Sequence, residues 1–120
     1  MRIFLVILTS FLMVACSARI EDYRNMQPAL DLQEYFDGNI TAWGQFQDRS
    51  GMVIKRFRVD MTGTWVGNEG TLDERFTYDD GSKQQRIWKI KKLENGRYTG
   101  RANDVIGEAQ GMAAGPALQW

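Results

Sequence analysis

The chain contains no histidine, one cysteine and two prolines among its 120 residues. Imidazole is the usual transition-metal ligand and the usual general base near neutral pH, so its absence argues against zinc sites and Ser-His or Cys-His catalysis. No loop shows the carboxylate spacing of a calcium site. These absences favour a protein that is not an enzyme, and they predict no metal ion and no cofactor.

The chain also has no excess of positive or negative charge, because fifteen basic residues balance fifteen acidic ones. No overall field would draw the chain to nucleic acid, and the alternation of basic and aromatic residues in "KRFR", residues 55–58, is more typical of a solvated strand face. What the chain does have is aromatic residues: four Trp, four Tyr and six Phe. Its length and composition predict one small globular domain.

The first fifteen residues have the pattern of a signal peptide. Arg2 supplies a positive start, and the uncharged, mostly apolar run from Ile3 to Ala15 is too short to cross a bilayer comfortably. The stretch "MVACS" resembles a bacterial lipobox, with Met13 at the usual leucine position and Ala15 before Cys16. We therefore expect cleavage after Ala15 and lipidation of Cys16; the alternative is an ordinary signal peptide whose cleavage site contains a cysteine.

Lipidation would fix the location of the protein. The acyl chains on Cys16 would hold it to a membrane, and residues 16–30, which are polar and aperiodic, would act as a tether. Ser17, rather than aspartate, follows the cysteine. That resembles an outer-membrane sorting signal, so we expect the bacterial cell envelope, at the outer membrane facing the periplasm.

Residues 31–120 predict a β domain that begins with a short helix. Asp31 can cap a helical turn that ends at Gly38. Beyond it, residues 53–65 alternate strongly between apolar and polar side chains, which is typical of a half-buried strand. Glycine-containing turns separate such segments at "DRSG", "GNEG", "DDG" and "ENG".

Turn chemistry predicts which residues lie opposite one another. A three-residue loop at 79–81 pairs Glu74 with Arg86 and places Leu72 opposite Trp88. A four-residue turn at 48–51 would set Phe46 beside Val53 and Ala42 beside Phe57, with Trp43 on the opposite face. The resulting fold class is all-β: an antiparallel up-and-down meander of six strands that curls into a lipocalin-like barrel, complete or open at one edge.

The last predicted strand, residues 107–117, has glycine or alanine at every odd position. If that face points inward, the space it frees is filled by aromatic rings from other strands or by a bound molecule. If the even face points inward, Met112, Leu118 and Trp120 fill the core. Pro116 cannot donate a ladder hydrogen bond and marks an edge, a bulge or a break.

Five residues are candidate ligand-lining positions on the inner face. Glu74 and Arg86 form the clear opposite-charge pair there and could hold a polar head group; alternatively they form a structural ion pair. Trp65, Trp88 and Tyr98 could line a cavity for a bound molecule; alternatively they fill the core. No residue is a candidate catalytic group or metal ligand.

Six sequence blocks stand out between residues 30 and 120: LQEYFDGNITAWGQFQDRSG, RFRVDMTGTW, GTLDERFTYDDG, RIWKI, GRYTGRANDVIGEAQG and GPALQW. Together they resemble the bacterial lipoprotein family of unknown function called DUF3833. The resemblance implies an exported, lipid-anchored, lipocalin-like protein, but no catalytic or binding residues. Members of the family are often encoded near enzymes that modify membrane fatty acids, which implies a role with lipids or fatty acyl chains. Family members continue with further strands, so it also implies either a C-terminal truncation or a sheet open at one edge.

These observations predict a lipid-anchored protein that binds or shields a small hydrophobic molecule, such as a lipid or fatty acyl chain. The alternative is a structural or interaction lipoprotein with a filled barrel that docks a partner protein. Neither the ligand nor a partner can be named from the residues.

Overall fold

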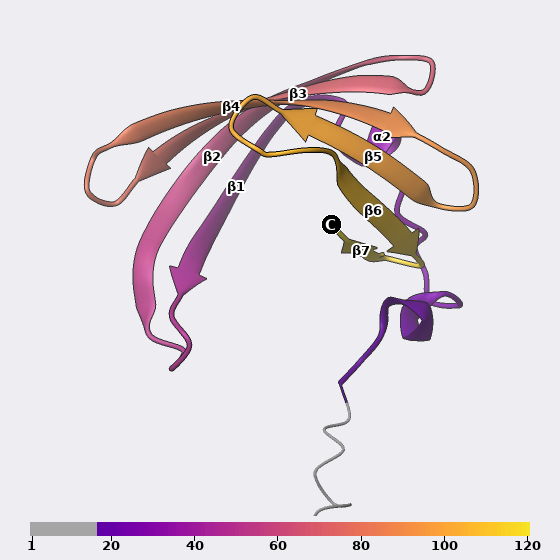
Figure 1. The fold of residues 1–120 in the computed structure, drawn as a ribbon, viewed down its shortest axis with the longest axis horizontal. Helices are drawn as coiled ribbons and strands as arrows, with labels where there is room; N and C mark the ends of the chain where they lie inside the picture. Colours follow the sequence, from indigo (N-terminus) through magenta and orange to yellow (C-terminus); the bar gives the residue numbers. More distant parts are fainter. Residues whose placement is uncertain (1–16) are drawn as a thin grey trace, which may run out of the picture.

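A computed structural model describes residues 17–120 and contains one antiparallel sheet whose seven strands follow chain order (Figure 1). The predicted all-β meander is confirmed. The predicted signal peptide, residues 1–15, and the lipidated Cys16 lie outside the described residues. The strands are β1 (Gly38–Gln47), β2 (Val53–Val66), β3 (Glu69–Tyr78), β4 (Lys83–Lys92), β5 (Arg97–Ala102), β6 (Ala109–Ala114) and β7 (Ala117–Gln119).

Two hairpins have the turns that the sequence predicts. Gly81 has φ of 83° in the three-residue β3–β4 loop, and this loop sets Glu74 opposite Arg86 as predicted. In the β4–β5 turn, Asn95 and Gly96 have φ of 58° and 73°, the left-handed conformation that an Asn-Gly hairpin turn requires.

The predicted register of β1 against β2 is wrong by two residues. Ala42 lies opposite Val59 rather than Phe57, and Phe46 lies opposite Lys55 rather than Val53. The register shifts between Phe46 and Gln47, so a β-bulge near the turn displaces the pairing. Because the error is an even number of residues, each side chain still faces the predicted side of the sheet.

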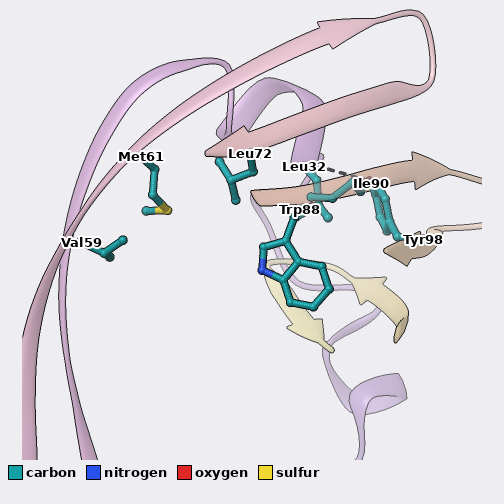
Figure 2. Packing of buried hydrophobic residues seen from close by; sticks show 7 residues of the cluster. All are labelled: Leu32, Val59, Met61, Leu72, Trp88, Ile90 and Tyr98. Carbon is teal, nitrogen blue, oxygen red and sulfur yellow. Dashed lines mark hydrogen bonds between the residues drawn. The ribbon is translucent and has the colours of Figure 1, made fainter. Parts of the chain in front are cut away.

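The sheet curls into an open half-barrel whose apolar side is concave (Figure 1). Alternation along β2 buries Val59 and Met61 on this side and exposes the residues between them. Figure 2 shows how the core side chains gather beneath the curve. The buried core consists of Leu32, Val59, Met61, Leu72, Trp88, Ile90 and Tyr98.

The C-terminal part differs from the single strand predicted for residues 107–117. The chain turns at Gly115, which has φ of 52°, and Ala117–Gln119 returns as a seventh strand beside β6. Pro116 lies in that turn, which is the strand break that its missing N–H allows. Within residues 17–120, β1 and β7 each pair on one side only, so the described sheet has two open edges.

The segment before the sheet is partly ordered, although the sequence predicts only a tether there. A 3₁₀ helix, η2 (Ile20–Tyr23), contacts β6 and β7, and the Leu30 amide donates to the Gly115 carbonyl over 2.8 Å. The predicted short helix is confirmed as α2 (Leu32–Tyr35), with Asp31 as its N-cap. Among residues 17–120, no helix is long and apolar enough to span a membrane.

Candidate functional site

Helix α2 closes one end of the concave face. The Asp31 side chain accepts a hydrogen bond from the Gln33 amide at 3.0 Å and forms an ion pair with the Lys92 ammonium at 2.7 Å. The bond from Lys92 lowers the pKa of Asp31 below its usual range. These contacts fix α2 against the β4–β5 hairpin and bury Leu32 in the core.

Two of the five predicted ligand-lining residues hold this helix. The Tyr98 side chain is 3% exposed, and its hydroxyl oxygen accepts a hydrogen bond from the Leu32 amide at 3.3 Å. The Trp65 indole donates to the Phe36 carbonyl over 3.3 Å. Both polar atoms are therefore engaged with the chain itself, which agrees with core filling rather than with ligand contact at these two positions.

Trp88, the third predicted aromatic residue, meets Trp120 across the small-residue face. Their rings are perpendicular, with centroids 5.4 Å apart. The Trp120 ring lies directly over Gly100 and Gly111, where a Cβ atom would collide with it. The odd face of β6 therefore points inward, and tryptophan rings fill the space that its missing side chains leave.

The other end of the concave face carries an aromatic wall, which we define as Phe46, Phe57, Phe76 and Tyr78. Phe57 lies at its centre, with ring centroids 5.4 Å from both Phe46 and Phe76. The Phe76 and Tyr78 rings stack at 6.0 Å. Phe46 is 49% exposed and its three companions are partly exposed, so no described segment covers this wall as α2 covers the opposite end.

A polar cluster of Glu74, Gln84, Arg86 and Asp104 borders the aromatic wall. Arg86 and Asp104 form a close ion pair, with nitrogen–oxygen distances of 2.9 and 3.0 Å. Gln84 donates to Asp104 at 3.2 Å and accepts from the Tyr78 hydroxyl at 2.7 Å. The cluster thus ties the β5–β6 loop, which carries Asp104, to β3 and β4.

The predicted Glu74–Arg86 ion pair is replaced by this arrangement. The two residues are cross-strand neighbours, but the guanidinium pairs with Asp104, and no ion pair within 4.0 Å joins Arg86 to Glu74. Sequence reasoning missed Asp104 because it lies in a loop with no periodicity. The Arg86 bond lowers the pKa of Asp104.

The pKa of Glu74 is shifted by its surroundings. Burial on the apolar face raises its pKa to about 7; the nearby charge of Arg86 opposes this rise and that of Asp104 adds to it. Near neutral pH, Glu74 can therefore donate a hydrogen bond when protonated and accept one when ionised. Arg86 adds further donors beside it. The pair can bind the polar end of a molecule whose apolar part lies on the aromatic wall.

The described residues contain no group of three or more His, Cys, Asp or Glu side chains positioned to hold a metal ion. A groove of about 710 Å³ lies on the opposite, convex side of the sheet. Three cations, Lys89, Lys91 and Arg101, line that groove. Their partners are Thr71, Glu69 and Glu108, respectively, so no unpartnered cation marks a ligand site there.

A known protein family matches this chain over most of its length. The model of a family described as "Protein of unknown function (DUF3833)" matches residues 10–120. The chain belongs to this family. DUF3833 supplies no activity and no binding residues, so the concave face of this member must be interpreted from its own contacts. Searches of curated proteins and of solved structures returned no match.

Proposed function

We propose that this DUF3833 protein is a non-enzymatic lipoprotein of the bacterial cell envelope that binds a small hydrophobic molecule, such as a lipid or fatty acyl chain, on its concave face. The observation that carries the proposal is the exposed aromatic wall beside the polar cluster that contains Glu74 and Arg86. A surface of this kind offers apolar contact area next to a few polar groups that can orient a ligand, the usual make-up of a small-molecule site.

The two ends of the concave face would then have different tasks. Helix α2 and the Trp88–Trp120 pair fill one end, so the ligand would lie against the other. Its chain would contact Phe57 and Phe76, and its polar end would face Glu74 and Arg86. Acylation of Cys16 would keep the protein at the outer membrane facing the periplasm, where such molecules are abundant.

The filled end also supports the second candidate, a lipoprotein that docks a partner protein. Trp88 is only 9% exposed and its ring packs on Trp120, as expected of a barrel that stabilises itself rather than enclosing a ligand. The aromatic wall would then be a contact surface for the partner.

One experiment separates the two candidates. We would extract the full-length protein from membranes, identify co-purifying lipids by mass spectrometry, and determine the mass of the N-terminal peptide to detect acylation of Cys16. Recovery of a stoichiometric lipid is expected. Folded, acylated protein that carries no lipid would instead favour docking.

Replacing Arg86 with Met tests the proposed head-group contact. We expect Arg86→Met to bind the lipid at least about tenfold more weakly, because a hydrogen bond to a charged group contributes about 1.5–3 kcal/mol. Arg75→Met is the matched control, since Arg75 lies on the opposite face of β3 and is highly exposed. Equal lipid retention by both variants would show that Arg86 does not bind the head group.

A further inference from the structure

The β1–β2 hairpin extends beyond the rest of the sheet. Pairing of β2 with β3 begins at Phe57 opposite Tyr78, whereas pairing of β2 with β1 continues to Val53. Residues 45–56 form the projecting end of this hairpin, which we call the hairpin tip (Figure 1). Its base is joined to the β3–β4 turn by hydrogen bonds between Arg56 and Asp79. The hairpin tip carries none of the polar cluster described above.

Large apolar side chains are exposed on both faces of the hairpin tip. Met52 in the loop is 66% exposed and Ile54 is 64% exposed, while Phe46 at the edge of the aromatic wall is 49% exposed. Strand alternation points Phe46 to the concave side and Ile54 to the convex side. A flat protein partner would cover one face, whereas a fluid apolar medium would surround both.

The charges of the hairpin tip suit an anionic medium. Within residues 45–56, Arg49, Lys55 and Arg56 provide three cations against one carboxylate, Asp48. Lys55 and Arg56 adjoin Asp80 and Asp79 of the β3–β4 turn, whereas Arg49 lies in the loop at the end of the hairpin. The Asp48 carboxylate already accepts hydrogen bonds from the Ser50 amide and hydroxyl and from the Met52 amide. Basic residues beside exposed apolar ones are typical of segments that enter the interface of an anionic membrane.

The position of the hairpin tip in the molecule agrees with contact between the tip and a membrane. Figure 1 shows the tip and the first described residues, in indigo, at the same end of the molecule, and the concave side of the sheet opens toward that end. A chain anchored through residues that precede Ser17 would hold the tip and the open side toward the same bilayer.

We propose that the hairpin tip inserts its apolar side chains, Met52, Ile54 and Phe46, into the interfacial region of a bilayer that contains anionic phospholipids. This inference rests on the proposed function for the membrane anchor and adds a second contact. It orients the concave face toward the lipid, so that a bound acyl chain could pass directly between bilayer and aromatic wall.

The test is a nitroxide label on the full-length, acylated protein, attached through Met52→Cys, in vesicles of phosphatidylcholine with or without phosphatidylglycerol. Flotation with the vesicles reports the anchor, and collision of the label with a water-soluble nickel complex reports insertion. Lys83→Cys is the matched control, because Lys83 is exposed and lies on β4, which β3 separates from the β1–β2 hairpin. With phosphatidylglycerol, we expect the position-52 label to collide with nickel at least about threefold less often than the position-83 label.

The other outcomes overturn the proposal in distinguishable ways. Flotation with equal collision rates at positions 52 and 83 would leave the anchor intact and contradict insertion. Protection at position 52 that is independent of phosphatidylglycerol would contradict the role of the cations. Failure of the protein to float would contradict both the anchor and the hairpin contact.

Discussion

Glu74 is the residue whose environment departs most from that of an ordinary surface side chain. It lies on the apolar side of β3, and burial raises its pKa to about 7, well above the usual glutamate value. Between these two values the folded chain binds a proton that the unfolded chain releases, so the free energy of unfolding falls as the pH rises through this window. The chain has no histidine to obscure the effect.

Glu74→Gln should remove this pH dependence. At pH 5 we expect the variant and the natural protein to have similar stability, and at pH 8 we expect the variant to be more stable by about 1–3 kcal/mol, since one pKa unit corresponds to 1.4 kcal/mol and partial exposure reduces the effect. Urea denaturation at both pH values measures it. Glu69→Gln, at an exposed position on the same strand, should leave the pH dependence unchanged. If the difference in stability between Glu74→Gln and the natural protein is the same at pH 5 and pH 8, the burial effect is contradicted.

The residue scale also shows where sequence reasoning about the site stops. Glu74 and Arg86 could be placed opposite each other because Gly81 fixes the hairpin register. The ion-pair partner of Arg86 could not be predicted, because Asp104 reaches it from a loop whose path no periodic pattern specifies. The sequence offers Trp120 as a core residue in one of its two alternatives, but the position of its ring over Gly100 and Gly111 depends on the turn at Gly115.

At the scale of elements, short turns with strong residue preferences made the hairpins predictable. The β3–β4 and β4–β5 turns contain a residue in the left-handed conformation, and both have the predicted form. The β1–β2 loop also has a left-handed glycine, Gly51, but Asp48 pairs with Met52, so the turn is one residue shorter than predicted. The bulge between Phe46 and Gln47 adds the second residue of the register error. The order of the strands was unaffected, because consecutive antiparallel strands pair wherever the connection is short.

Helix α2 depends on a close approach to β2 that only glycine permits. A Cβ atom at position 63 would collide with the Phe36 carbonyl, which also accepts the Trp65 indole hydrogen bond. Gly63→Ala should therefore push the segment after α2 away from the sheet and lower the free energy of unfolding by about 1–3 kcal/mol. Denaturant unfolding measures the loss, and a shift in tryptophan fluorescence should report the altered surroundings of Trp65.

The matched control for this prediction is Thr64→Ala, on the exposed face of the same strand. It should change stability by less than about 0.5 kcal/mol, as most surface substitutions do. If Gly63→Ala is as mild as this control, the contact between α2 and β2 does not depend on the missing side chain.

At the scale of the whole molecule, the described sheet encloses its apolar side only in part. Helix α2 and the Trp88–Trp120 pair cover one end, and the aromatic wall at the other end is exposed within residues 17–120. A ligand that covers this wall would stabilise the folded protein, because it binds the folded state and not the unfolded one. The length of its apolar chain should then set the size of the effect.

A series of fatty acids tests this. As the chain lengthens from about 6 to about 14 carbons at a fixed free concentration, each CH₂ that reaches the wall should add up to about 0.8 kcal/mol, or roughly 3–6 °C in Tm for a domain of this size. Arg86→Met should lower every Tm increment by a similar amount yet keep the dependence on chain length, since it removes a head-group contact alone. A Tm that does not change with chain length would show that the wall binds no acyl chain, and the docking function would then account better for its exposure.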